Sequence, residues 1–126
     1  MGLLDGKNAL VFGIANKNSI AWGITQALHR EGANIGLSYA IEQLERRVMP
    51  LAESLDIDFV ERADANNDDE LDAVFEKAKE KFGKIDILVH AIAFAEREDL
   101  NGEYLDTSRE GFSRAMETSV FSLVAL

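Results

Sequence analysis

Short apolar runs alternate along the chain with longer stretches in which apolar residues recur every three or four positions. Residues 9–12 (Ala-Leu-Val-Phe) are apolar on both faces, as a central strand of a parallel sheet requires. The longer stretches have one apolar face and predict helices. The clearest of these faces consists of Leu71, Val74, Phe75, Ala78 and Phe82. The pattern therefore predicts strands and helices in strict alternation.

The predicted elements follow from these runs and from the residues that bound them. The predicted strands are Lys7–Phe12, Ala33–Tyr39, Ile57–Val60 and Ile85–Ala91. The predicted helices are Ser19–Glu31, Ile41–Leu55, a third between Asn67 and Gly83, and a last one from Thr107 to the end. Pro50 should kink the second helix or start a new segment, because proline has no backbone N–H to donate.

Helix starts are predicted from polar side chains that can accept a hydrogen bond from a free backbone N–H. Ser19 stands at the N-cap position of the first helix. Asn67 with Glu70 resembles a capping box before the third helix. The segment Thr107-Ser108-Arg109-Glu110 predicts a full capping box before the last helix.

The order βαβαβαβα predicts one topology. Right-handed crossovers convert it into a Rossmann-type doubly wound parallel sheet of order 3-2-1-4, an α/β fold with ligands at the carboxyl ends of strands one and four. No fifth strand follows Leu126, so strand four is expected to be an edge strand. We therefore expect residues 1–126 to be the N-terminal part of a longer single-domain protein, truncated after the helix that follows strand four. An independent four-stranded domain is the alternative.

The loop between the first strand and the first helix is the first candidate site. It runs from Gly13 to Ser19, and Gly13 ends the strand where a side chain would keep a ligand away from the backbone. A helix N-terminus offers free N–H groups and the positive end of the helix dipole, which together suit a dinucleotide pyrophosphate. The spacing differs from the usual G-x-G-x-x-G motif. An ordinary strand-to-helix turn is the alternative.

Composition excludes several classes of function. The net charge of −10, from 23 acidic and 13 basic residues, argues against binding of DNA or RNA. Only two histidines occur, His29 and His90, without a cluster of further ligands, so no metal site is predicted. No apolar run is long enough to span a membrane, and the absence of cysteine fits the cytoplasm.

Four segments resemble one known family. They are 13–24 (GIANKNSIAWGI), 29–33 (HREGA), 90–95 (HAIAFA) and 109–112 (REGF). Together they are similar to the NADH-dependent enoyl-acyl-carrier-protein reductases of bacterial fatty-acid synthesis, divergent members of the short-chain dehydrogenase/reductase superfamily. The resemblance covers all 126 residues but only the first half of a typical member. A glycine followed six residues later by Ser-Ile-Ala is the distinguishing motif.

The resemblance implies a binding role for specific residues. Those implied to bind the dinucleotide are Gly13, Ser19 and Ile20 at the pyrophosphate and ribose, Ala40 at the adenosine ribose, Asp64 and Ala65 at the adenine, and Ala91, Ile92 and Ala93 at the nicotinamide. Phe94 and Ala95 are implied to approach the acyl substrate. Relatives usually carry an apolar residue near the nicotinamide ribose where this chain has Thr118.

The implied reaction is hydride transfer from NADH to the C2=C3 double bond of a trans-2-enoyl thioester carried by acyl-carrier protein. The family's catalytic tyrosine and lysine stand six or seven positions apart, and neither Tyr39 nor Tyr104 has a lysine at that spacing. No catalytic residue is therefore expected in this chain. NADPH stays open, because Arg46 or Arg47 could meet a 2′-phosphate. The family also implies a homo-oligomer, a tetramer.

Each residue has a plainer interpretation, and two other functions stay open. Asp64 could be a solvated loop carboxylate or a helix cap, His90 a hydrogen-bonded core histidine, and Phe94 a core or lid residue. The chain could belong to another short-chain reductase. It could also be a dinucleotide-binding module without chemistry, if it natively ends at Leu126.

Overall fold

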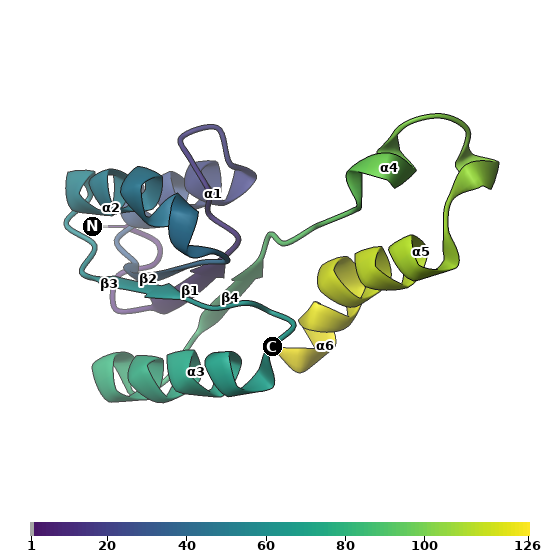
Figure 1. Cartoon of the computed structure of the whole chain (residues 1–126). Helices are drawn as coiled ribbons and strands as arrows, with labels where there is room; N and C mark the ends of the chain where they lie inside the picture. The colour runs from purple at the N-terminus through teal and green to yellow at the C-terminus, as the bar shows by residue number, and fades with distance from the viewer. Residues whose placement is uncertain (1) are drawn as a thin grey trace. The chain divides into compact units, whose positions relative to one another are not determined.

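The computed structural model describes residues 2–126. These residues form two units, one ending at Ala91 and one spanning Ile92–Leu126. The first unit contains a fully parallel sheet of order β3-β2-β1-β4 (Figure 1). Its strands are β1 (Asn8–Phe12), β2 (Asn34–Tyr39), β3 (Phe59–Arg62) and β4 (Ile87–His90). The predicted fold class and strand order are confirmed.

Helices cover both faces of this sheet. The helices α1 (Ile20–Arg30) and α2 (Glu45–Ser54) lie on one face, and α3 (Asp68–Phe82) lies on the other (Figure 1). A short 3₁₀ turn, η1 (Glu42–Leu44), leads directly into α2. The sheet is thus buried between two layers of helix, which explains why β1 is apolar on both sides.

Alternate residues of β1 serve the two layers. Val11 belongs to the buried cluster that includes Trp22 of α1 and Val48 of α2. Phe12 faces the opposite layer and stacks on Phe75 of α3, with ring centroids 5.8 Å apart. Both Val11 and Phe12 are 1% exposed or less, so the centre of the first unit is fully dry.

The strand β3 begins later than predicted, because of the way α2 ends. The strand was expected at Ile57–Val60 but begins at Phe59. Asp56 adopts a left-handed backbone (φ 55°), and the N–H of Ile57 donates to the carbonyl of Ala52 at 2.9 Å. This is the hydrogen bond that closes a helix with a left-handed residue after its last turn. Ile57 therefore completes the helix end and is unavailable to the sheet.

Pro50 lies inside a single helix. No new segment begins there, since α2 runs unbroken from Glu45 to Ser54. Proline removes the hydrogen bond to the carbonyl four residues earlier, here that of Arg46. Pro50 and Arg46 are both exposed, so water can reach that carbonyl.

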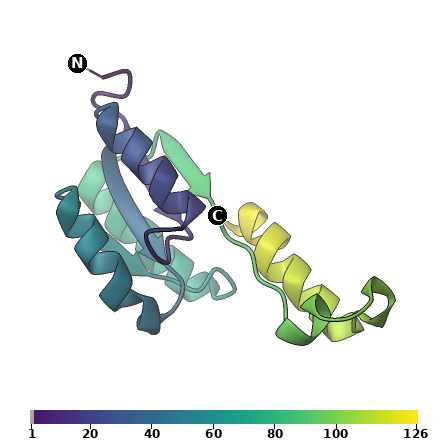
Figure 2. The ribbon, with the colours of Figure 1, turned by 90° about the horizontal axis from the view of Figure 1, so that it is seen from above.

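The second unit is a series of short helical segments. These are α4 (Arg97–Leu100), the 3₁₀ turn η2 (Tyr104–Asp106), α5 (Arg109–Met116), the π-helical turn η3 (Glu117–Phe121) and α6 (Ser122–Ala125). The last three follow one another end to end (Figure 2). The expected uninterrupted α-helix is therefore wrong: it contains a wide turn over residues 117–121.

The start of α5 also differs from the prediction. Ser108 is the N-cap, and its Oγ accepts from the N–H of Gly111 at 3.0 Å. The N–H of Ser108 itself donates to Oδ1 of Asp99 at 3.1 Å. The predicted box of Thr107 with Glu110 is wrong, because the Thr107 hydroxyl donates to the carbonyl of Tyr104. By contrast Asn67 does cap α3, accepting from the N–H of Glu70 at 3.2 Å.

Candidate functional site

The carboxyl ends of the strands bring the predicted residues of the first unit to one edge of the sheet. Ala40 follows β2, Asp64 comes two residues after β3, and Gly13 and Ala91 directly follow β1 and β4. In the order of the strands they read Asp64, Ala40, Gly13, Ala91. The chain passes from β1 to β2 on one side and later returns to β4 on the other side of β1. In doubly wound sheets, ligands bind at the carboxyl ends of the strands where the order reverses in this way.

Gly13 is required by the packing of the protein itself. Its φ is +108°, and a Cβ at this position would lie 2.0 Å from the carbonyl oxygen of Ala91. The N–H of Ala91 donates to the carbonyl of Phe12 at 3.0 Å, which draws the end of β4 against β1. Gly13 therefore has a structural reason of its own, and its predicted role in admitting a ligand to the backbone stays a prediction.

Ser19 occupies the predicted N-cap position of α1 but makes different hydrogen bonds. Its Oγ accepts from the N–H of Ala15 at 2.9 Å and from the N–H of Asn16 at 3.0 Å, and it forms no side-chain cap on the helix. The Oδ1 of Asn16 in turn accepts from the N–H of Asn18 at 2.8 Å. Two side chains thus fix the shape of the loop from within.

This arrangement leaves the first turn of α1 available to an anion. The N–H groups of Trp22 and Gly23 donate to the carbonyl of Ser19. Within residues 2–126 the N–H groups of Ile20 and Ala21 have no acceptor, and the first turn of α1 carries no acidic residue. Two free donors at the positive end of a helix dipole can bind an anion.

A cationic cavity of about 450 Å³ lies between this loop and α2. Its charged lining residues are Lys17, Arg46 and Arg47. None of the three forms an ion pair within the described part of the chain. The end of β2 carries Tyr39 and Ala40 and no acid. Three cations therefore line this cavity in a chain whose net charge is −10, while Glu42 and Glu45 lie close enough to act electrostatically on Tyr39.

Asp64 begins the turn that leads into α3. Its Oδ1 accepts from the N–H of Asn66 at 2.9 Å, and its carbonyl accepts from the N–H of Asn67 at 2.9 Å. The side chain is exposed, and the neighbouring Ala65 is buried. Asp64 thus has a structural role close to the plainer interpretation. A contact of its carboxylate with adenine stays a prediction.

The remaining predicted residues belong to the second unit. Ile92 and Ala95 are half-buried, and Ala93 and Phe94 are exposed. A cavity of about 460 Å³ in this unit has an almost wholly apolar lining, composed of Ala93, Phe94, Ala95, Leu100, Ala115, Met116 and Ser119. Leu100, Ala115, Met116 and Ser119 were not predicted as site residues. The helical spacing of the last three indicates only a packing face. Contacts of Phe94 and Ala95 with a substrate stay predictions.

The two tyrosines lie in different environments. Tyr39 is 7% exposed, and burial together with the negative charge of Glu45 raises its pKa. A raised pKa makes the phenol a poorer proton donor. Tyr104 is 81% exposed and lies on the surface of the second unit.

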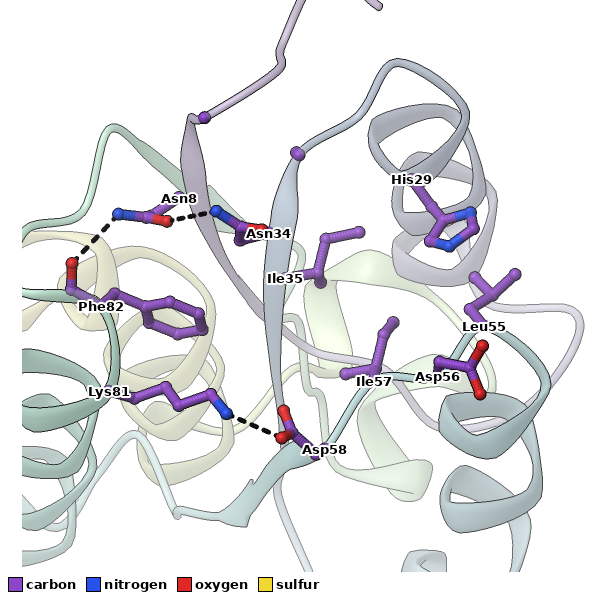
Figure 3. A pocket seen from close by; sticks show the side chains of 12 residues that line it. Asn8, His29, Asn34, Ile35, Leu55, Asp56, Ile57, Asp58, Lys81 and Phe82 are labelled. Atoms are coloured by element: carbon purple, nitrogen blue, oxygen red, sulfur yellow. Dashed lines mark hydrogen bonds and ion pairs between the residues drawn. The ribbon is translucent and has the colours of Figure 1, made fainter.

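A cavity of about 730 Å³ lies at the opposite edge of the sheet, at the amino ends of the strands (Figure 3). Its polar side chains mostly bind one another or the backbone. Asn34 donates to Oδ1 of Asn8 at 3.0 Å, and Asn8 donates to the carbonyl of Phe82 at 3.2 Å. Lys81 binds Asp58 at 2.7 Å and lowers the pKa of that carboxyl. The cavity is therefore explained as the place where the strand starts are joined to the end of α3.

Two further classes of site were sought in the same part of the molecule. Residues 2–126 contain no group of three or more His, Cys, Asp or Glu side chains arranged to hold a metal ion. None of the helices described over this range combines the length and apolar character needed to cross a bilayer.

Comparison with known proteins places this geometry in a family. Residues 13–126 match the family model described as "Enoyl-(Acyl carrier protein) reductase". The chain is 46% identical over 126 residues to the NADH enoyl-[acyl-carrier-protein] reductase FabI of Aquifex aeolicus, covering 100% of this chain and 47% of that protein. The chain thus spans about half the length of the curated relatives it matches.

Solved structures agree with this result. The crystal structure of the Aquifex aeolicus reductase superposes with a TM-score of 0.96 at 46% identity, covering 99% of this chain and 50% of that one. The Bacillus cereus enoyl-acyl carrier protein reductase, crystallised with NADP⁺ and indole naphthyridinone, superposes with a TM-score of 0.94 at 50% identity, covering 99% and 49%. The chain belongs to the enoyl-(acyl carrier protein) reductase family.

Proposed function

We propose that this chain forms the dinucleotide-binding part of an NADH-dependent enoyl-acyl-carrier-protein reductase of fatty-acid elongation. The observation that carries the proposal is the loop of α1. Ser19 turns its hydroxyl onto the loop and leaves the N–H groups of Ile20 and Ala21 for an anion. Family membership supplies the identity of that anion, the pyrophosphate of a nicotinamide dinucleotide.

The other predicted residues can be assigned along the same edge of the sheet. Asp64 and Ala65 after β3 would hold the adenine, and Ala40 after β2 would face the adenosine ribose. Ala91 after β4, with Ile92 and Ala93 next in the chain, would line the nicotinamide. The order of the strands supports this assignment, because the three positions follow one another as the parts of an extended dinucleotide do.

When bound, NADH supplies the hydride that reduces the C2=C3 double bond of a trans-2-enoyl thioester. This chain would bind and orient the dinucleotide, while Phe94 and Ala95 would contact the acyl group. The developing enolate oxygen needs a hydrogen-bond donor. Tyr39 is buried with a raised pKa and Tyr104 is 81% exposed, and neither is proposed as that donor.

The preferred dinucleotide is proposed to be NADH. Relatives such as the Aquifex aeolicus enzyme carry NADH in their name, whereas the Bacillus cereus structure holds NADP⁺. Lys17, Arg46 and Arg47 line a cavity beside the loop and could accept a 2′-phosphate. NADPH is therefore the specific alternative.

The partner is proposed to be an enoyl group carried by acyl-carrier protein, and the location the cytoplasm. A homo-oligomer, a tetramer, is also proposed. Exposed apolar side chains on α5 and the segments after it support an assembly; they include Phe112, Met116, Val120, Phe121 and Leu123.

A kinetic assay of the complete polypeptide encoded by the gene tests the proposal. With crotonyl thioester, we expect oxidation of NADH in step with loss of the double bond, and a higher kcat/KM with NADH than with NADPH. Arg46→Ala should lower only the NADPH value. Absence of enoyl reduction with both nucleotides would overturn the proposal. It would favour another short-chain reductase or a binding module, which titration with NADH would then separate.

A further inference from the structure

The loop after β4 is fastened to the helix of its own unit at three points. The hydroxyl of Ser119 contacts the backbone of Phe94. The carboxylate of Glu96 pairs with the guanidinium of Arg114. Asp99 accepts from the N–H at the start of α5. The attachment points on the helix therefore span its length from the N-cap to the π-helical turn.

Ser119 makes the most specific of these contacts. Its Oγ accepts from the N–H of Phe94 at 2.9 Å and donates to the carbonyl of Phe94 at 3.2 Å. One hydroxyl thus engages both backbone groups of one residue, which fixes the orientation of the two flanking peptide planes. Phe94 and Ser119 both line the apolar cavity of about 460 Å³ in this unit.

The π-helical turn explains how Ser119 reaches the loop. Gly111 and Ala115 lie one helical turn apart, but a regular α-helix would rotate residue 119 progressively away from that line. A π turn holds more residues per turn, so each residue turns through a smaller angle. Residues 117–121 form such a turn, and Ser119 shares the cavity with Ala115. Turns of this kind are frequent at functional sites.

We propose that Ser119 is a positioning residue that fixes the backbone of Phe94 and thereby shapes the wall that meets the acyl substrate. This inference rests on the proposed function, because it takes the neighbourhood of Phe94 as the substrate contact. Phe94 is 46% exposed, so water can replace the hydroxyl when it is removed. Loss of Ser119 should therefore loosen the loop without unfolding the protein.

The first measurement is amide hydrogen exchange in the complete polypeptide. Ser119→Ala should speed exchange of the Phe94 N–H by about fivefold, the effect of losing one ordinary hydrogen bond. Ser119→Thr keeps a hydroxyl on the same carbon and should restore slow exchange. Ser113→Ala is the matched control, since Ser113 is exposed on the same helix and forms no side-chain hydrogen bond in the described chain.

The second measurement is the kinetics of the same variants. Ser119→Ala should lower kcat/KM for a crotonyl thioester by about ten- to a hundredfold, because small misplacements of a reacting group are costly. The KM for NADH should not change. A merely structural defect would instead affect both substrates and the melting temperature, and Ser119→Thr would not correct it.

Wild-type exchange at Phe94 in Ser119→Ala would overturn the proposal. So would a loss of thioester kinetics that Ser119→Thr shares in full. If the wild-type polypeptide reduces no enoyl thioester, the proposed function fails. The exchange comparison still decides whether Ser119 holds Phe94.

Discussion

The unit ending at Ala91 and the unit beginning at Ile92 are stabilised by different interactions. In the first, side chains such as Leu10, Val11 and Leu37 are completely buried between layers of helix. In the second, large apolar side chains including Leu105, Leu123 and Val124 are more than half exposed. What organises the second unit is a set of hydrogen bonds and an ion pair between side chains and the nearby backbone or helix.

This difference has consequences for function. A dry core holds the strand ends in fixed positions, which suits a site that must orient a large dinucleotide. Segments without a core open at a lower free-energy cost, and ligand-binding loops are drawn from such segments. Within these 126 residues we therefore expect the first unit to resist local opening more strongly than the second.

The largest effect is expected from replacing a buried phenylalanine of the first unit, compared with an exposed phenylalanine of the second. In the 126-residue chain, Phe12→Ala should lower the free energy of unfolding by about 3–5 kcal/mol, because it leaves a cavity beside Phe75. Phe112→Ala should change it by less than about 0.5 kcal/mol, since Phe112 is 51% exposed. Urea denaturation measures both. Equal losses would show that Phe112 is part of a core, and the comparison would be wrong.

A smaller effect is expected from the glycine that joins β1 to β4. Gly13→Val should destabilise the chain by about 2–4 kcal/mol, from the positive φ and the contact with the Ala91 carbonyl. The matched control is Gly23→Ala in α1, where a Cβ meets nothing within 4 Å. It should stabilise by about 0.5–1 kcal/mol. The measurement is urea denaturation together with NADH titration. If Gly13→Val kept full stability but lost NADH binding, Gly13 would serve ligand clearance after all.

The sequence was most informative where a periodic apolar pattern decides the structure. The order of the sheet followed from four apolar runs and the rule of right-handed crossovers, and the cap at Asn67 followed from one local side chain. The start of β3 could not be predicted, because the signal that ends α2 is a left-handed Asp56 where glycine is usual. A local pattern does not show that choice.

The sequence predicted where the residues of the candidate site lie, but not which contacts they make. The residues after each strand follow from topology alone. The reason for Gly13 depends on how close Ala91 comes, and the partners of the Ser19 hydroxyl depend on the fold of its loop. The contact of Ser119 with Phe94 joins residues 25 positions apart through a π turn. No spacing rule predicts such a contact.

The smallest effect concerns the cap of α5, where the second unit relies on a local hydrogen bond. Ser108→Ala should destabilise the start of this helix by about 1 kcal/mol, because the N–H of Gly111 loses its acceptor. Amide exchange at Gly111 in the 126-residue chain should then be about fivefold faster. Thr107→Ala is the control, since the Thr107 hydroxyl binds the carbonyl of Tyr104 and not the helix.

Global unfolding measured by urea should hardly change with either variant, since the core lies in the other unit. If Thr107→Ala released Gly111 and Ser108→Ala did not, Thr107 would be the true cap. If Ser108→Ala lowered global stability as much as Phe12→Ala, the second unit would share the core of the first.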